Sequence, residues 1–336
     1  MKAVRIDQHG GPEVLRIVDV PDPVPKADEV LVHVTHVGLN HLDVWVRRGV
    51  DSHHFPLPLI PGSDIAGIRD DTGERVVLHP GFGCEACPTC ANGRHDLCRR
   101  YAIRGETVNG GMRERLVVPT SHLLPCPLDP AEAASLPLSL LTAWHMLVGR
   151  ANIQSGQTVL VQAGASGVGS LAIQIAAMHG AEVAVTASSV EKRHRCLEMG
   201  ATHAWSYDSA KDEVRAWTNK RGVDIVIDHV GSSTWKSSIR CLARGGTLVT
   251  CGATSGHEAA IDLRVLFFKQ LSLLGSTMGT MHEMRESWTA VQAGAVQPVV
   301  DRILPMTSLA AAHALLENRA VTGTVVVEQD LCDSSG

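Results

Sequence analysis

The stretch at residues 158–177, TVLVQAGASGVGSLAIQIAA, constrains the fold of this chain more than any other. An apolar run long enough for a buried strand ends at a glycine-rich turn, and apolar residues then recur with helical spacing. A strand, a turn containing Gly164, Gly167 and Gly169, and a helix are typical of sites that bind a nucleotide pyrophosphate. The turn reads G-x-S-x-x-G, with Ser166 where a glycine is usual, so taken alone it also fits an ordinary turn between a parallel strand and its helix.

Strand-like and helix-like segments alternate after this turn, which favours an α/β fold with a doubly wound parallel sheet. The expected strands are 158–162, 182–187, 203–207, 224–230, 247–251 and 271–275. A helix is expected before the turn, at 140–150. Further on we expect a helix at 283–295, a strand at 302–304, a helix at 308–319 and a strand at 324–328, and we expect this last part to return to the first domain.

The first 125 or so residues instead have the short alternating segments of antiparallel sheet, as at residues 29–37. The pattern changes at NHLDVWVRRG, where Asn40 suits a helix N-cap, Asp43 completes a capping box and Gly49 ends the helix. Farther on, IAGIRDDTGERVVL predicts two strands joined by a tight turn at residues 71–73. The first domain is therefore expected to be mostly β.

Composition limits the class of partner. The chain has 336 residues, 44% of them hydrophobic, which is enough for two cores, and its formal net charge is −5. This mild charge favours a small-molecule substrate, with no nucleic-acid or membrane partner. No apolar segment approaches 20 residues and the first ten residues lack a signal-peptide layout, so we expect a cytoplasmic protein.

Four of the nine cysteines cluster, whereas Cys126, Cys196, Cys241, Cys251 and Cys332 are scattered singly. The cluster has the spacing C-x2-C-x2-C-x7-C and consists of Cys84, Cys87, Cys90 and Cys98. Four thiolates on one short loop suit tetrahedral zinc with no open position, which is a structural type of site. Unpaired surface thiols are the alternative, and His95 lies inside the loop as a possible replacement ligand.

The order of these parts resembles the medium-chain dehydrogenase/reductase superfamily, in which a GroES-like β domain is joined to a Rossmann domain. GLNHLDVWVRRG, IPGSDIAG, LPLSLLTAWHML, AGASGVG and LLGST look like its quinone oxidoreductase branch, whereas the cysteine loop looks like the structural zinc lobe of the zinc alcohol dehydrogenases. The resemblance implies a GroES-like catalytic domain at 1–126 with the zinc lobe at 84–98, a Rossmann NADP(H)-binding domain at 127–275, and a return to the catalytic domain at 276–336.

The resemblance also bears on catalytic metal. The alcohol dehydrogenases place zinc ligands where this chain has Asn40, Ser63 and Leu138, so none of the usual three is present. An unorthodox site built from His41, Asp43, Asp64 and His79 is the alternative.

Cofactor choice depends on the end of the second strand of the Rossmann sheet, where NAD-binding proteins commonly carry an acidic residue. Here the chain has Ser188 and Ser189, followed by Lys192 and Arg193, which favours the 2′-phosphate of NADPH. The alternative is that the two cations are only solvated helix residues. By resemblance and from the turn, the cofactor-binding residues are expected to be Thr142, Gly164, Ser166, Gly167, Val168, Gly169, Ser188, Ser189, Lys192, Tyr207, Val230, Gly252, Ala253, Ser276 and Thr277.

The leading hypothesis is hydride transfer from NADPH to a quinone or an α,β-unsaturated carbonyl without catalytic zinc. The residues expected around the nicotinamide are Asn40, Asp43, Trp45, Arg48 and Asp64, with Arg48 or the Asn40 amide polarising the carbonyl. Each also has a structural explanation, as a helix cap, a core residue or a solvated cation. Two other functions stay open: an alcohol dehydrogenase with a rearranged metal site, and a non-catalytic NADPH-binding protein. The apolar strand at 271–274 predicts a homodimer through a sheet edge.

Overall fold

The computed structural model describes residues 1–51 and 53–331; Cys332 lies outside the described residues. The chain forms two compact units. The first comprises Met1–Leu138, Thr280–Arg285 and the chain from Pro298 onward, and the second comprises Ser139–Gly279 and Glu286–Gln297. The domain boundaries drawn from the sequence, after residues 126 and 275, stay predictions.

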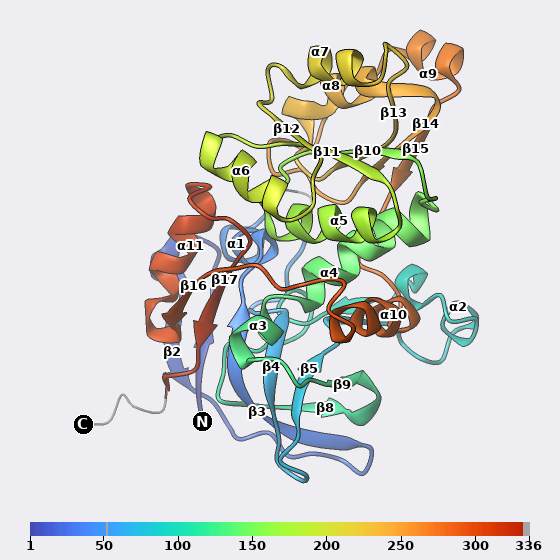
Figure 1. The fold of residues 1–336 in the computed structure, drawn as a ribbon. Helices are drawn as coiled ribbons and strands as arrows, with labels where there is room; N and C mark the ends of the chain where they lie inside the picture. Colours follow the sequence, from blue (N-terminus) through green and yellow to red (C-terminus); the bar gives the residue numbers. More distant parts are fainter. Residues whose placement is uncertain (52, 332–336) are drawn as a thin grey trace. The chain divides into compact units, whose positions relative to one another are not determined.

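The second unit is built on a parallel sheet with the strand order β12-β11-β10-β13-β14-β15 (Figure 1). Its strands are β10 (Thr158–Val161), β11 (Glu182–Thr186), β12 (His203–Trp205), β13 (Val223–Asp228), β14 (Leu242–Thr250) and β15 (Ser272–Gly275). The order reverses at β10, where Val159 pairs with Val183 on one side and Ile225 on the other. This reversal is the switch point at which doubly wound folds bind their ligands.

Helices cover both faces of this sheet, with α5 and α6 on one face and α7, α8 and α9 on the other (Figure 1). Their bounds are α5 (Gly167–Met178), α6 (Val190–Glu198), α7 (Ala210–Trp217), α8 (Ser232–Cys241) and α9 (Leu263–Lys269). Leu160, Val226 and Leu248 from the strands pack with Val214 and Ile239 from the helices in one buried cluster. The doubly wound α/β fold expected from the sequence is confirmed.

Two elements differ in detail from the expectation. The strand expected at 247–251 begins earlier, because Leu242 already pairs with Val223 before a bulge, and Thr247 then resumes the ladder opposite Ile225. The helix expected at 140–150 is α4 (Pro137–Trp144) followed by a π-helical segment, His145–Arg150. Proline is well tolerated in the first turn of a helix, which fits the earlier start.

The first unit is built on a mostly antiparallel sheet with the order β16-β17-β3-β4-β5-β9, and β8 also pairs with β3. Its strands are β3 (Glu29–Gly38), β4 (Asp64–Arg69), β5 (Arg75–Leu78), β8 (Arg115–Pro119), β9 (Leu123–Pro125), β16 (Val300–Pro305) and β17 (Thr324–Glu328). Alternation along β3 puts Val32 and Val34 into the core, where they pack with Leu116 and Val325. The C-terminal strand β17 pairs with β3, so the end of the described chain completes the first sheet.

Smaller elements complete this unit. They are β1 (Lys2–Arg5), β2 (Arg16–Asp19), β6 (Gly81–Phe82), β7 (Ala102–Ile103), α1 (His41–Arg48), α2 (Pro88–Ala91), α3 (Pro130–Ala134) and α11 (Leu309–Glu317). Helix α10 (Met281–Gln292) begins in the first unit and ends in the second.

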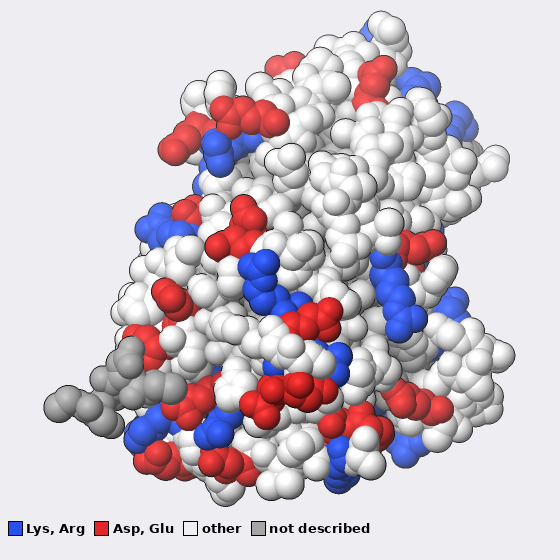
Figure 2. Space-filling view, turned by 60° about the horizontal axis from the view of Figure 1, so that its bottom comes forward, with Lys and Arg blue, Asp and Glu red and all other residues white. Residues whose placement is uncertain are grey.

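The surface offers mixed charge on the face drawn in Figure 2, where acidic and basic side chains are interspersed. Among residues 1–51 and 53–331, no helix combines the length and apolar composition needed to cross a membrane. The cytoplasmic location and the lack of nucleic-acid or membrane partners stay predictions.

Candidate functional site

The N-terminus of α1 carries the polar cluster of the first unit. Asp43, in the first turn, accepts the Asn40 backbone N–H through Oδ2 at 2.8 Å, as a capping box requires, and the Gly62 N–H through Oδ1 at 3.0 Å. Gly62 has φ +99°, and a Cβ at this position would lie 2.9 Å from a Val37 methyl group, so glycine is needed here. The side chain of Asp43 is therefore buried and holds the 40–43 turn against the chain at residue 62.

Asp64 is the second buried carboxylate of the cluster. It begins β4, pairs with Gly38 on β3 and has no exposed surface. Its Oδ2 accepts the Asn40 side-chain N–H at 2.8 Å, and its Oδ1 accepts the backbone N–H of Leu138 at 2.5 Å. Asn40 thus donates a hydrogen bond to each acid, from its backbone N–H to Asp43 and from its side-chain amide to Asp64. Its side chain is only half-buried.

Burial dominates the electrostatics of both acids. Desolvation raises the pKa of Asp43 to about 6 and that of Asp64 to about 7, although the hydrogen bonds that each accepts act in the opposite direction. The charge of Asp43 adds to the upward shift at Asp64. Near neutral pH the cluster can therefore hold or release a proton beside Asn40.

The positions where the resemblance would place zinc ligands are otherwise engaged. The buried Ser63 hydroxyl donates to the Arg104 carbonyl at 2.6 Å, and Leu138 contributes an apolar side chain. His79, from the alternative metal site, accepts the Gly81 N–H through Nδ1, and burial lowers its pKa to about 3; its Nε2 is buried and has no hydrogen-bond partner among the described residues. Of the groups of metal-binding side chains found within residues 1–51 and 53–331, none includes His41, Asp43, Asp64 or His79.

Trp45 and Arg48 lie on other faces of α1. Trp45 packs against an apolar cluster that includes Val46, Phe55 and Leu59. Arg48 is 60% exposed, and its Nε lies 2.7 Å from Glu317. The structure brings Asn40, Asp43 and Asp64 together; the catalytic roles expected for all five residues stay predictions.

Sequence reasoning missed the neighbour of Arg48. The guanidinium of Arg47 is fully buried and donates to Glu317 of α11 at 2.5 Å, so Glu317 bridges two consecutive arginines. The burial of Arg47 could have been predicted from its spacing. Arg47 follows the buried Asp43 by one helical turn, so both side chains lie on the same inward face of α1. Its partner lies 270 residues away, which no local pattern reveals.

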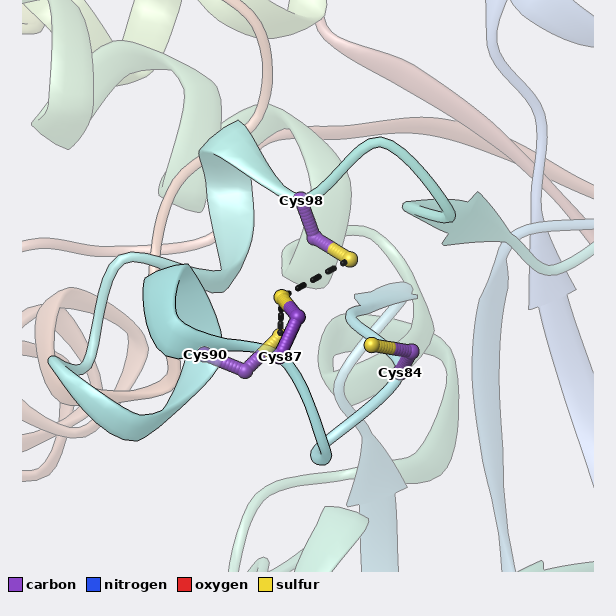
Figure 3. Close-up of side chains that lie close together, drawn as sticks. All are labelled: Cys84, Cys87, Cys90 and Cys98. Atoms are coloured by element: carbon purple, nitrogen blue, oxygen red, sulfur yellow. Dashed lines mark hydrogen bonds between the residues drawn. The ribbon is translucent and has the colours of Figure 1, made fainter.

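The four clustered cysteines form the second site of the first unit (Figure 3). Their sulfur atoms all lie within 4.8 Å of one another, and Cys87 Sγ is 3.5 Å from Cys90 Sγ and 3.8 Å from Cys98 Sγ. A tetrahedral zinc with bonds near 2.3 Å needs sulfur atoms about 3.8 Å apart, so this donor set fits zinc. His95 points elsewhere, since its Nε2 accepts the Met281 N–H at the start of α10 at 2.7 Å.

The glycine turn of the second unit is shaped by steric limits. A Cβ on Gly169 would lie 2.3 Å from the Ala163 carbonyl oxygen, and one on Gly164 would lie 2.8 Å from Val185 Cβ. The turn is tied to β11 by two hydrogen bonds, from Ala163 N–H to Thr186 Oγ1 at 3.1 Å and from Gly164 N–H to the Thr186 carbonyl at 2.9 Å. A turn of five residues, 162–166, thus joins β10 to α5, with Ser166 as the N-cap of the helix and Gly167, Val168 and Gly169 in its first turn.

A buried polar chain beneath the turn was not foreseen. Thr186 donates to Gln162 at 2.6 Å, Gln162 donates to Ser238 at 3.0 Å, and Ser238 donates to Asp228 at 2.6 Å. It links the carboxyl ends of β10, β11 and β13, which a satisfied buried network holds in one arrangement.

The segment after β11 is where a ribose is expected. Ser189 caps α6 by accepting the Lys192 N–H at 3.1 Å, so Lys192 lies in the first turn of this helix. Ser188 is exposed, and the Arg193 guanidinium donates to the Ala187 carbonyl at 3.2 Å. Hydroxyl groups and cations therefore follow the end of β11, although the exposed Glu191 also lies in the first turn of α6.

The remaining expected cofactor residues mostly follow the carboxyl ends of the parallel strands, where such folds bind ligands. Tyr207 comes after β12, Val230 after β13, Gly252 and Ala253 after β14, and Ser276 and Thr277 after β15, whereas Thr142 lies on α4. The Ser276 hydroxyl is buried and has no hydrogen-bond partner within the described protein, which is a polar atom that a cofactor can satisfy. The unpartnered Ser276 hydroxyl and the turn at Gly169, where the backbone has no Cβ, together fit a bound dinucleotide.

Comparison with known proteins agrees with this geometry. Residues 26–128 match the model of the alcohol dehydrogenase GroES-like domain, and residues 167–293 match that of the zinc-binding dehydrogenase family. The quinone oxidoreductase of Mus musculus is 30% identical over 341 residues, which cover 97% of each chain.

Solved structures of similar chains extend the comparison. A crystal structure of an NAD-dependent alcohol dehydrogenase is 41% identical with a TM-score of 0.94, covering 98% of this chain and 99% of that one. The 2-octenoyl-CoA carboxylase reductase CinF, in complex with NADP and 2-octenoyl-CoA, is 27% identical with a TM-score of 0.88, covering 100% and 88%.

Fold, turn and relatives define an NAD(P)H-dependent oxidoreductase with a small-molecule substrate. The chain belongs to the medium-chain dehydrogenase/reductase superfamily, in its branch of quinone oxidoreductases and alcohol dehydrogenase-like proteins. These relatives favour an enzyme over a non-catalytic NADPH-binding protein.

The buried acid Asp64 predicts a pH-dependent stability. Its folded pKa of about 7 lies well above the ordinary pKa of an aspartate in an unfolded chain, so the folded state binds the proton more tightly than the unfolded chain does. The resulting stability is present at low pH and is lost as pH rises through the folded pKa. We expect the wild-type protein to lose about 1–3 kcal/mol relative to Asp64→Asn between pH 5 and pH 8.

Urea unfolding of both proteins at the two pH values measures this difference. Asp212→Asn is the control, because its carboxylate is 80% exposed. A difference between the wild-type protein and Asp64→Asn that is the same at pH 5 and pH 8 would contradict the raised pKa.

Proposed function

We propose that this protein reduces a quinone or an α,β-unsaturated carbonyl with NADPH, without a catalytic zinc. The cofactor supplies a hydride to a carbon of the acceptor, and one proton completes the reduction as the oxidised cofactor leaves. The observation that carries the proposal is that Asn40 is hydrogen-bonded to two buried acids, Asp43 and Asp64. Asn40 stands at a position where the alcohol dehydrogenases place a zinc ligand.

Asn40 is the residue that we place against the acceptor oxygen. Its side chain is the half-buried member of the cluster, whereas Asp43 and Asp64 are fully buried and act through it as positioning residues. An amide held in a fixed orientation can stabilise negative charge as it develops on the oxygen, because no reorganisation is needed during the reaction. Asp64 holds a proton near neutral pH and is our candidate for the source of the second hydrogen.

Preference for NADPH is supported by the segment after β11. Ser188, Ser189 and Lys192 stand there without a carboxylate among residues 186–190 that would repel a 2′-phosphate. The CinF complex contains NADP, whereas the more similar alcohol dehydrogenase is NAD-dependent. Cofactor choice therefore depends on this segment rather than on overall similarity.

We also propose one structural zinc per chain, held by Cys84, Cys87, Cys90 and Cys98. Their sulfur spacing fits a closed tetrahedral site, and four thiolates leave no position for substrate. This zinc would stabilise the 84–98 lobe and take no part in hydride transfer.

The second candidate function is alcohol oxidation with NAD through a rearranged catalytic metal site. The similarity to the NAD-dependent alcohol dehydrogenase favours it. The engagement of the Ser63 hydroxyl with the Arg104 carbonyl favours the metal-free reaction, whereas His79 keeps a buried Nε2 without a hydrogen-bond partner among the described residues.

The two candidates predict opposite results in one assay. We expect NADPH to be oxidised by a quinone or an enone faster than NADH is, and a chelator to leave the rate unchanged while the protein stays folded. Lys192→Ala removes a cation that attracts the 2′-phosphate, so it should weaken NADPH binding by about 1–3 kcal/mol and leave NADH binding nearly unchanged.

Arg195→Ala is the matched control, since this exposed cation of α6 pairs with Glu198. Initial rates with a quinone, an enone and a primary alcohol, for both cofactors and with or without chelator, measure the preference. Faster alcohol oxidation with NAD, abolished by the chelator before any unfolding, would establish the second candidate instead.

We propose that the protein is a homodimer through the β15 edge of the parallel sheet. β15 ends the strand order, so one side of its backbone pairs with no strand in the described sheet. The preceding helix α9 exposes Leu263, Phe267 and Phe268, each at about 60%. An apolar surface beside an open strand edge suits pairing with a second copy.

Sedimentation at micromolar concentration tests the dimer. We expect a dimer for the wild-type chain and a monomer for Phe267→Glu/Phe268→Glu, because two buried carboxylates would have no partner at the interface. Val190→Glu, on exposed apolar surface of α6, is the control and should stay dimeric. A wild-type monomer, or a dimer unaffected by the double substitution, would refute this interface.

A further inference from the structure

His229 contacts the glycine turn from a strand that the motif does not include. It follows β13, and its Nε2 lies 2.8 Å from the Ser166 hydroxyl, 63 residues earlier in the chain. Ser166 stands where the dinucleotide-binding pattern usually has its middle glycine. A side chain at this position must be kept away from the pyrophosphate, which the backbone normally approaches there.

The hydrogen-bonding pattern shows how Ser166 is kept away. Its single hydroxyl hydrogen donates to the Ala163 carbonyl at 2.9 Å, and its oxygen accepts the Gly169 N–H at 3.0 Å. Because that hydrogen is already engaged, the contact with His229 requires the histidine to donate from Nε2. The oxygen then accepts two hydrogen bonds and donates one, which fully satisfies a hydroxyl group.

These three hydrogen bonds hold the Ser166 side chain inside the glycine turn. Ala163 lies two residues after the end of β10 and is itself hydrogen-bonded to Thr186 of β11. His229 adds the link to β13, so the turn is held to all three strands at the switch point of the sheet.

We propose that His229 is a positioning residue for the pyrophosphate of the cofactor. By holding the Ser166 hydroxyl inside the turn, it keeps the first backbone N–H groups of α5 in the orientation that receives a phosphate. The pyrophosphate is common to NADH and NADPH, so His229 supports both cofactors equally. This inference rests on the binding of a nicotinamide cofactor and is independent of the acceptor.

A double-mutant cycle in cofactor binding tests the inference. Dissociation constants for NADH and NADPH are measured by fluorescence without any acceptor, so the identity of the acceptor does not affect the result. We expect His229→Leu to weaken both cofactors by a similar factor, about threefold to tenfold, as for the loss of one hydrogen bond. His229→Gln, whose amide can donate from nearly the same place as Nε2, should recover most of the affinity.

The Ser166→Gly background separates positioning from general destabilisation. Without the Ser166 hydroxyl the contact between His229 and the turn is absent, so adding His229→Leu to Ser166→Gly should leave both dissociation constants unchanged. The unfolding temperature of each variant is recorded in parallel. Equal loss with and without Ser166, loss for NADPH alone, or unchanged affinity in His229→Leu would each overturn the inference, and none of them bears on which acceptor is reduced.

Discussion

The close approach of Gly169 to the Ala163 carbonyl is the constraint on which the cofactor-binding unit depends. An added Cβ would lie 2.3 Å from that oxygen, well inside contact distance, so α5 can begin within six residues of the end of β10 only with glycine at this position. That arrangement places the N-terminus of α5 at the point where the strand order reverses. Hydrogen bonds with Thr186 at the end of β11 and with His229 after β13 then hold the turn in place, as our proposal for the binding of the cofactor pyrophosphate requires.

The first unit depends on a different physical problem, that of keeping two carboxylates out of water. Burying a charged carboxylate is costly unless hydrogen bonds compensate, and burial has raised the pKa of Asp43 and of Asp64. Four N–H groups bind these acids, two of them from Asn40. The hydrogen bonds that compensate for this burial fix the orientation of the Asn40 amide.

Much of this could be predicted from the sequence where the cause is local. The capping box at Asn40 and Asp43, the glycine turn and the cysteine spacing each depend on residues that lie within 15 consecutive positions of the chain. The strands of the parallel sheet followed from their apolar composition, and the helix-like segments between them from the change in period. The bulge in β14 was missed because it depends on the register against β13.

The long-range polar contacts could not be predicted. His229 meets Ser166 across 63 residues, and Glu317 meets Arg47 across 270. Such pairs are formed by the packing of whole elements, and neither residue carries a local signal of its partner. The sequence prediction named Arg48 and missed the buried Arg47 for the same reason. The two arginines are adjacent in the chain and differ only in the face of α1 on which they lie.

The central claim is that hydrogen bonds at Asn40, and not a metal ion, act on the acceptor. Counting zinc in the freshly purified protein tests it most directly, by elemental analysis of the wild-type chain and of Cys87→Ser. The account predicts one zinc per wild-type chain and none in the variant, because the only site it proposes is the cysteine lobe. Two zinc ions per wild-type chain, or one that remains in Cys87→Ser and whose removal stops turnover, would contradict it.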